Sequence, residues 1–178
     1  MFSPSTLVRE HPQIAEILNR AGWSQHRKVM IPDEYPKTLQ HYGLPFRTHA
    51  TTFLESLYGL RVEHDRWPGS GIPAAIEVGN TASLARICTL LALPKHAADA
   101  LSLLGLSAPS VIGNTAELVF LDANGEVGCL DAQYEAVTRH SNIYHFLNWT
   151  FLGGPARPRI RRLMDDEIPA PFRAVDPM

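Results

Sequence analysis

The feature that most constrains the fold is a turn between two apolar segments near the middle of the chain. Residues 117–121 form an apolar run typical of a buried strand, and Asp122, Ala123, Asn124 and Gly125 follow it directly. An Asn-Gly pair adopts positive φ at low cost, so this sequence favours a tight turn. Because residues 126–130 are suited to a returning strand, the segment predicts a β-hairpin and therefore antiparallel pairing.

Helical patterns surround this hairpin. Residues 8–21 carry apolar side chains at helical spacing, with Pro12 in the first turn and Gly22 just after the end, so they predict an amphipathic helix. The same reasoning predicts five further helices, over residues 35–42, 48–58, 83–93, 95–104 and 142–152.

Three more segments have the pattern of strands. Residues 60–64 alternate apolar and polar side chains, and residues 29–31 and 74–78 are predicted as short strands. Helices and strands do not alternate regularly along the chain, and hairpin pairing dominates. The pattern therefore predicts an α+β fold, a single domain with a central, mostly antiparallel sheet flanked by several helices.

The segment after Gly154 differs in composition from the rest of the 178 residues. It is rich in proline, and its arginines are Arg157, Arg159, Arg161 and Arg162. These guanidinium groups could bind phosphates, but the acidic residues 165–167 follow at once and favour a solvated, self-compensating segment. Residues 155–178 are therefore predicted to form an extended tail that either lies on the domain or stays mobile.

The composition excludes several classes of protein. Hydrophobic residues make up 45% of the chain, which is enough to bury a core, and the net charge of -2 gives no broad electrostatic footprint for nucleic acid or an anionic membrane. We find no secretory signal and no apolar stretch long enough to span a bilayer. The two cysteines, Cys88 and Cys129, are predicted to be free buried thiols, although a disulfide stays possible, and we expect a cytoplasmic protein.

The sequence holds no recognisable catalytic or metal-binding motif. It lacks a Walker loop, a dinucleotide-binding glycine loop, a nucleophile elbow, and His-Glu-x-x-His or Cys-x-x-Cys pairs. We therefore predict no catalytic, cofactor-binding or metal-binding residue and no cofactor. A hydrolase that uses His64 or His140 with nearby acids stays open as a minor alternative.

One cluster has the composition of a protein-binding surface. Glu63, Asp65, Arg66 and Trp67 place charge beside a large aromatic side chain at the end of a predicted strand. Tryptophan and arginine are enriched at the energetic centres of interfaces. These four residues and Asp131 are predicted to bind a protein partner; the alternative for Trp67 is that it covers the edge of the core.

The helix predicted over residues 8–21 ends in Ala21-Gly22-Trp23, and Arg27 follows four residues later. This segment resembles the N-terminal signature of the SUKH superfamily, specifically of its third immunity-protein subgroup. Further similar segments are Tyr58-Gly59-Leu60, the Pro109 to Gly113 step, the hairpin around Gly125 and the closing helix to Gly154. The resemblance covers roughly residues 10 to 154, so residues 1–154 are identified as a SUKH-like domain.

The resemblance implies a function without catalytic residues. Proteins of this group are mostly bacterial cytoplasmic antidotes that bind and neutralise a cognate toxin domain, so the expected partner is a toxin protein rather than nucleic acid or membrane. A housekeeping regulatory or scaffold module of the same fold is the alternative, and the oligomeric state stays open. The signature residues are expected to be structural: Gly22, Trp23, Arg27, Gly59, Gly113 and Gly125. For Trp23, a core anchor is favoured over an exposed binding role.

Overall fold

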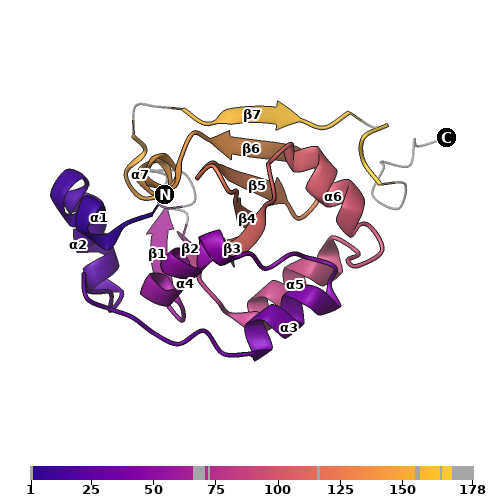
Figure 1. Ribbon diagram of the computed structural model, residues 1–178. Helices are drawn as coiled ribbons and strands as arrows, with labels where there is room; N and C mark the ends of the chain where they lie inside the picture. Colours follow the sequence, from indigo (N-terminus) through magenta and orange to yellow (C-terminus); the bar gives the residue numbers. More distant parts are fainter. Residues whose placement is uncertain are drawn as a thin grey trace.

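The predicted hairpin belongs to a seven-stranded sheet in which the order of the strands follows the order of the chain (Figure 1). The computed structural model describes residues 2–65, 71, 73–115, 117–154, 157–164 and 166–169. Every neighbouring pair of strands in the sheet is antiparallel. The strands are β1 (Arg61–Asp65), β2 (Pro73–Glu77), β3 (Ser110–Asn114), β4 (Glu117–Leu121), β5 (Val127–Asp131), β6 (Ala136–His140) and β7 (Arg159–Arg162).

The turn between β4 and β5 forms where the sequence predicts it. Gly125 has φ +88°, the region that glycine adopts without strain. The buried Asp122 carboxylate accepts hydrogen bonds from the backbone N–H groups of Asn124, at 2.8 Å, and Glu126, at 2.9 Å. The side chain of Asp122 therefore satisfies two backbone donors of the turn at a buried position.

Helices cover the sheet on two sides. In Figure 1, α3, α5 and α6 lie to the right of the sheet, and α1, α2 and α7 lie to its left. The antiparallel α+β fold with flanking helices is therefore confirmed. The helices are α1 (Pro4–Glu10), α2 (Pro12–Arg20), α3 (Glu34–His41), the 3₁₀ turn η1 (Thr48–Ala50), α4 (Thr51–Leu57), α5 (Thr81–Leu90), α6 (Ala97–Leu104) and α7 (Ile143–Leu152).

The N-terminal segment forms two helices, so the prediction of one helix over residues 8–21 is wrong. His11 leaves the helical region with φ −134° and ψ 55°, and Pro12 begins α2 because it has no N–H to donate to a preceding turn. The backbone N–H of Ser3 donates to the Tyr144 hydroxyl at 2.7 Å. This bond fastens the start of the helix pair to α7.

The strand predicted over residues 29–31 does not form. The backbone N–H of Val29 donates to the carbonyl of Glu55 at 2.9 Å, and the segment runs as an irregular loop. Three strands that the sequence analysis did not predict are present instead, namely β3, β6 and β7. All three are held by pairing with neighbouring strands rather than by a strong pattern of their own.

The segment after Gly154 contributes the last strand of the sheet. Arg159–Arg162 pairs with β6 along its whole length, with Arg161 opposite Val137. Of the two alternatives left open for residues 155–178, this part of the segment lies on the domain; residues 155, 156, 165 and 170–178 lie outside the described residues. Leu163 is also buried, so the segment adds apolar contacts as well as an edge strand.

Both cysteines are free and buried, as predicted. The core contains buried residues from α1 to α7 and from all strands except β7. In the part of the chain that the structure describes, no helix is long and apolar enough to cross a membrane.

Candidate interaction surface

The signature segment after α2 fixes the N-terminal helices to the core. Gly22 turns the chain with φ +93°, and Trp23 then folds inward until only 3% of its surface is exposed. Its indole N–H donates to the buried Ser56 hydroxyl at 2.8 Å. The prediction that Trp23 is a core anchor is confirmed.

Arg27 strengthens the same junction. Its guanidinium donates to the carbonyl of Ser56 at 2.8 Å and to the carbonyl of Tyr58 at 2.6 Å. Both carbonyls belong to the C-terminal end of α4, where backbone acceptors lack helical partners. Burial lowers the pKa of Arg27 from its ordinary value. Arg27 thus satisfies carbonyls beside the turn, in agreement with the structural role expected of the signature residues.

Two signature glycines stand beside β2, Gly59 just before β1 and Gly113 inside β3. Gly59 has φ +79°, and its N–H donates to the carbonyl of Val78 at 2.7 Å, which starts the β1–β2 pair. At Gly113 a Cβ would lie 2.8 Å from the carbonyl oxygen of Glu77, closer than side chains tolerate. Glycine at this position therefore allows β3 to approach β2.

The five predicted partner-binding residues do not form one cluster. Glu63 lies on β1 with 81% of its side chain exposed. Asp65 ends the same strand, and its Oδ2 accepts from the N–H of Gly71 at 3.3 Å. Because they are two positions apart, both point to the same face of the sheet. Arg66 and Trp67 lie outside the described residues.

Asp131 lies elsewhere, at the end of β5. Three strands separate β5 from β1 in the sheet. The Asp131 carboxylate accepts from the backbone N–H of Gln133 at 2.8 Å and thereby shapes the turn that leads toward β6. The structure therefore brings Glu63 and Asp65 together and places Asp131 away from them.

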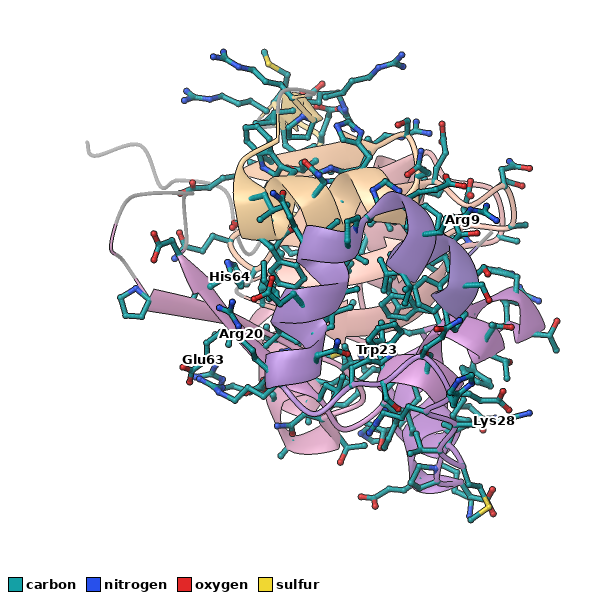
Figure 2. The ribbon with its side chains drawn as sticks, turned by 90° about the vertical axis from the view of Figure 1, so that its left-hand side faces the viewer. Arg9, Arg20, Trp23, Lys28, Glu63 and His64 are labelled. Atoms are coloured by element: carbon teal, nitrogen blue, oxygen red, sulfur yellow. The ribbon has the colours of Figure 1, made fainter. Side chains whose placement is uncertain are left out.

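A hollow of about 410 Å³ adjoins Glu63. It lies between α2, β1 and α7, and it is lined by Ile17, Arg20, Ala21, Arg61, Val62, Glu63, His64 and Phe151. Figure 2 shows Arg20, Glu63 and His64 near one another where α2 passes β1, whereas Arg9 and Lys28 lie on the far side of the helix. The hollow thus joins the predicted residue Glu63 to side chains from two helices.

The lining of this hollow combines apolar and charged side chains. Ile17 and Ala21 contribute aliphatic surface, and the ring of Phe151 meets the ring of His64 edge to face at 5.8 Å. Arg20 pairs with Glu16, and Arg61 pairs with Glu77. The lining residues on α2 and α7 were not predicted as part of the surface. Residues 17–21, β1 and residue 151 are far apart in the chain, and no sequence pattern indicates that they meet.

Burial favours the neutral forms of both cysteine thiols and of the His140 imidazole. Burial raises the pKa of the Cys88 thiol to about 12 and raises that of Cys129 well above its ordinary value. A thiolate, the nucleophilic form of cysteine, is therefore strongly disfavoured at both positions. Burial, together with His145, lowers the pKa of His140 to about 4.

In the described part of the chain, His64 and His140, the histidines of the hydrolase alternative, contact a backbone carbonyl and aromatic rings. His64 Nδ1 lies 2.7 Å from the backbone carbonyl oxygen of Asp65, and the His140 ring packs against the rings of His145 and Phe146. Among the residues that the structure describes, no three His, Cys, Asp or Glu side chains are grouped in a way that could hold a metal ion.

A second hollow, of about 420 Å³, lies between α6 and the C-terminal segment. Here His96 Nδ1 stands 3.5 Å from an Asp99 carboxylate oxygen, and Asp166 and Glu167 line the same space. His96 was not predicted as a site residue, although it lies three positions before Asp99 at the start of α6, a spacing that brings two side chains together on a helix. The hydrolase alternative stays a prediction, and His96 in this hollow is a further position at which it can be tested.

Comparisons with protein-family models, with curated proteins and with solved structures each give no match.

Proposed function

We propose that this chain is an immunity protein that binds a cognate toxin domain and neutralises it through the surface around β1. The observation that carries the proposal is the hollow beside Glu63, which combines apolar and charged side chains at an outer strand of the sheet. Protein interfaces have this composition, with a desolvated apolar centre surrounded by polar groups.

The scaffold supports such a role. Trp23 and Arg27 fix the helix that forms one wall of the hollow, so the wall is in place before a partner binds. Preorganisation of this kind reduces the entropic cost of association. We place the neutralisation in the cytoplasm, as expected from the sequence.

The proposal is tested by expressing the chain together with the toxin domain encoded by the neighbouring gene. We expect the two proteins to purify as a complex and the cells to survive. Glu63→Lys is expected to weaken the complex by about tenfold without changing the thermal midpoint of the free protein, because Glu63 is exposed.

A matched control makes the same change of charge elsewhere. Glu10→Lys alters an exposed residue at the end of α1, beside Arg9 and away from the hollow, and should leave binding unchanged. The proposal fails if the wild-type chain neither protects the cells nor binds the toxin domain. A broad set of other partners would instead favour the regulatory or scaffold alternative.

A further inference from the structure

Among the described residues, the strand β1 is one of the two outer strands of the sheet, and β2 is its one partner there. Leu60 and Val78 stand opposite each other at its start, and the N–H of Val78 donates to the carbonyl of Leu60 at 3.0 Å. In an antiparallel pair, hydrogen-bonded and non-hydrogen-bonded positions alternate. Val62 and His64 therefore bond to β2, whereas Arg61 and Glu63 direct their backbone N–H and C=O groups away from it.

The residue opposite Asp65 agrees with this alternation. That residue is Pro73, which has no N–H and fits only a position that makes no donor bond across the pair. Within the described part of the chain, no hydrogen bond occupies the outward backbone groups of Arg61 and Glu63. Two residues of β1 thus offer free donors and acceptors at the edge of the sheet.

The hollow described above lies along this edge. Four consecutive residues of β1, from Arg61 to His64, line it. Successive side chains of a strand point to opposite faces of the sheet, so consecutive residues share one hollow only where the hollow faces the edge of the strand. The free backbone groups of β1 therefore open into the hollow.

We infer that this edge accepts an extended segment of the partner protein, which pairs with Arg61 and Glu63 by main-chain hydrogen bonds and extends the sheet by one strand. The inference rests on the proposed function and specifies how the toxin domain is held. Addition of a strand to a free edge is a general mode of protein recognition, in which the main chain gives affinity and the alternate side chains give specificity.

The surroundings of the edge define the side chains of that segment. On the face of Val62 and His64, the hollow offers Ile17, Ala21 and Phe151, which fit an apolar side chain. On the opposite face the segment meets the exposed side chains of Arg61 and Glu63, which fit charged or polar neighbours. The segment therefore has an apolar residue between two polar ones.

A single extended segment fits this space better than a second copy of the sheet does. Across the hollow from β1 stands the C-terminal end of α2, with Ile17, Arg20 and Ala21. Neighbouring strands lie about 4.8 Å apart, so one strand fits beside β1, whereas the further strands of another sheet would meet α2.

The test exploits the direction of one backbone N–H. Glu63→Pro removes the outward donor but no hydrogen bond to β2, and proline is tolerated on an edge strand in this orientation. We expect Glu63→Pro to weaken the complex with the toxin domain of the neighbouring gene roughly tenfold to a hundredfold, because it leaves a partner carbonyl unpaired. Glu63→Ala, which removes the carboxylate and keeps the N–H, should weaken it distinctly less.

A matched control uses the other edge of the sheet. The N–H of Leu163 donates to the carbonyl of Glu135, so by the same alternation Ile160 directs its N–H away from β6. Ile160→Pro introduces the same ring at an outward position of β7 and should leave binding unchanged. Amide hydrogen exchange of the wild-type chain gives a second readout: the amides of Arg61 and Glu63 should exchange fast in the free protein and slowly in the complex.

The outcomes separate the two proposals. If the wild-type chain forms no complex, the proposed function fails and the inference fails with it. The inference is overturned, and the proposed function stands, if the wild-type complex forms but the toxin domain binds the Glu63→Pro variant as tightly as the Glu63→Ala variant. The same holds if the amides of Arg61 and Glu63 exchange as fast in the complex as in the free protein. A self-association of the free chain that Glu63→Pro abolishes would also overturn the inference, because the edge would then be occupied by a second copy.

Discussion

The indole N–H of Trp23 donates to the hydroxyl of Ser56 at 2.8 Å, and both side chains are buried. This bond joins the turn after α2 to α4, across 33 positions of the chain. Because neither group is exposed to water, each depends on the other for its hydrogen bond. The junction therefore responds to the loss of either partner.

Ser56→Ala is expected to lower the free energy of unfolding by about 1–3 kcal/mol, since it leaves the buried indole N–H without an acceptor. Urea denaturation measures the change. Trp23→Phe serves as the second arm of a double-mutant cycle, and the double variant should lose less stability than the sum of the two single variants. Strict additivity would show that the bond contributes nothing.

Arg27→Lys is expected to destabilise the fold by about 1–2 kcal/mol, although the charge is kept. The guanidinium reaches the carbonyls of Ser56 and Tyr58 at once through two nitrogens, whereas an ammonium group is a single point donor. The thermal midpoint provides the measurement. Lys28→Arg is the control, because Lys28 is largely exposed and its change should have no effect. Equal midpoints for Arg27→Lys and the wild type would contradict the role given to Arg27.

Gly113→Ala and Gly59→Ala should both destabilise the protein, for different reasons. At Gly113 the new Cβ meets the carbonyl oxygen of Glu77 at 2.8 Å, so the two strands must separate, and we expect a loss of about 1–3 kcal/mol. At Gly59 no atom lies within 4 Å, but φ is +79°, so the loss is about 1 kcal/mol and comes from backbone strain alone. Chemical denaturation of both variants tests the order; a larger loss at Gly59 would contradict it.

Stability should fall as the pH drops from about 6.5 to about 4. His140 is buried, and burial lowers its pKa to about 4. Between these two pH values the imidazole is therefore protonated in the unfolded chain and neutral in the folded protein. The contribution of neutral His140 to the free energy of unfolding is fully present above the ordinary pKa of histidine. It decreases by up to about 3 kcal/mol as the pH approaches about 4. Urea denaturation at several pH values measures the slope, and His140→Gln should flatten it. An unchanged slope in the variant would assign the effect to other groups.

A chain that ends at Gly154 should be less stable than the whole chain. Truncation removes β7, uncovers the edge of β6 and exposes apolar surface that Leu163 covers. We expect a clear fall in the thermal midpoint. A midpoint equal to that of the whole chain would show that residues 155–178 are a separate tail.

Much of the fold was predictable because glycine and proline mark its boundaries. Gly22, Gly105 and Gly153 follow helices with positive φ, and Asn124-Gly125 forms the hairpin turn. These residues encode local geometry that does not depend on the rest of the chain. The hairpin and the helices over α3 to α7 were predicted for this reason.

The strands that were not predicted depend on their neighbours. Arg159–Arg162 has almost no apolar residues, and its four residues form a strand because β6 offers a free edge beside it. At β3, the segment from Pro109 to Gly113 shows only a resemblance to the SUKH step before the hairpin, with no strand predicted there. Pairing across the sheet overrides weak local preference in both places.

The candidate surface was predictable only in part. Glu63 and Asp65 are identified by charge at a strand end, and the structure places them on an outer strand. The apolar side of the hollow comes from Ile17 and Phe151, which are 134 positions apart in the chain. Only the packing of α2 and α7 against β1 brings such distant residues together.

The contact between β2 and β3 separates the sheet into two parts, which we expect to unfold separately. Only Glu77 and Asn114 stand opposite each other there, whereas β1 and β2 pair over five positions. Buried Asn114 donates to the Ser83 hydroxyl at 2.8 Å, so the start of α5 bridges this narrow junction. Local opening tends to begin at the weakest junction of a structure, so we expect the backbone amides of the β1–β2 hairpin to exchange faster than those of β3 to β6. The strand that we propose binds the partner belongs to this hairpin, and a bound partner would slow the exchange by mass action.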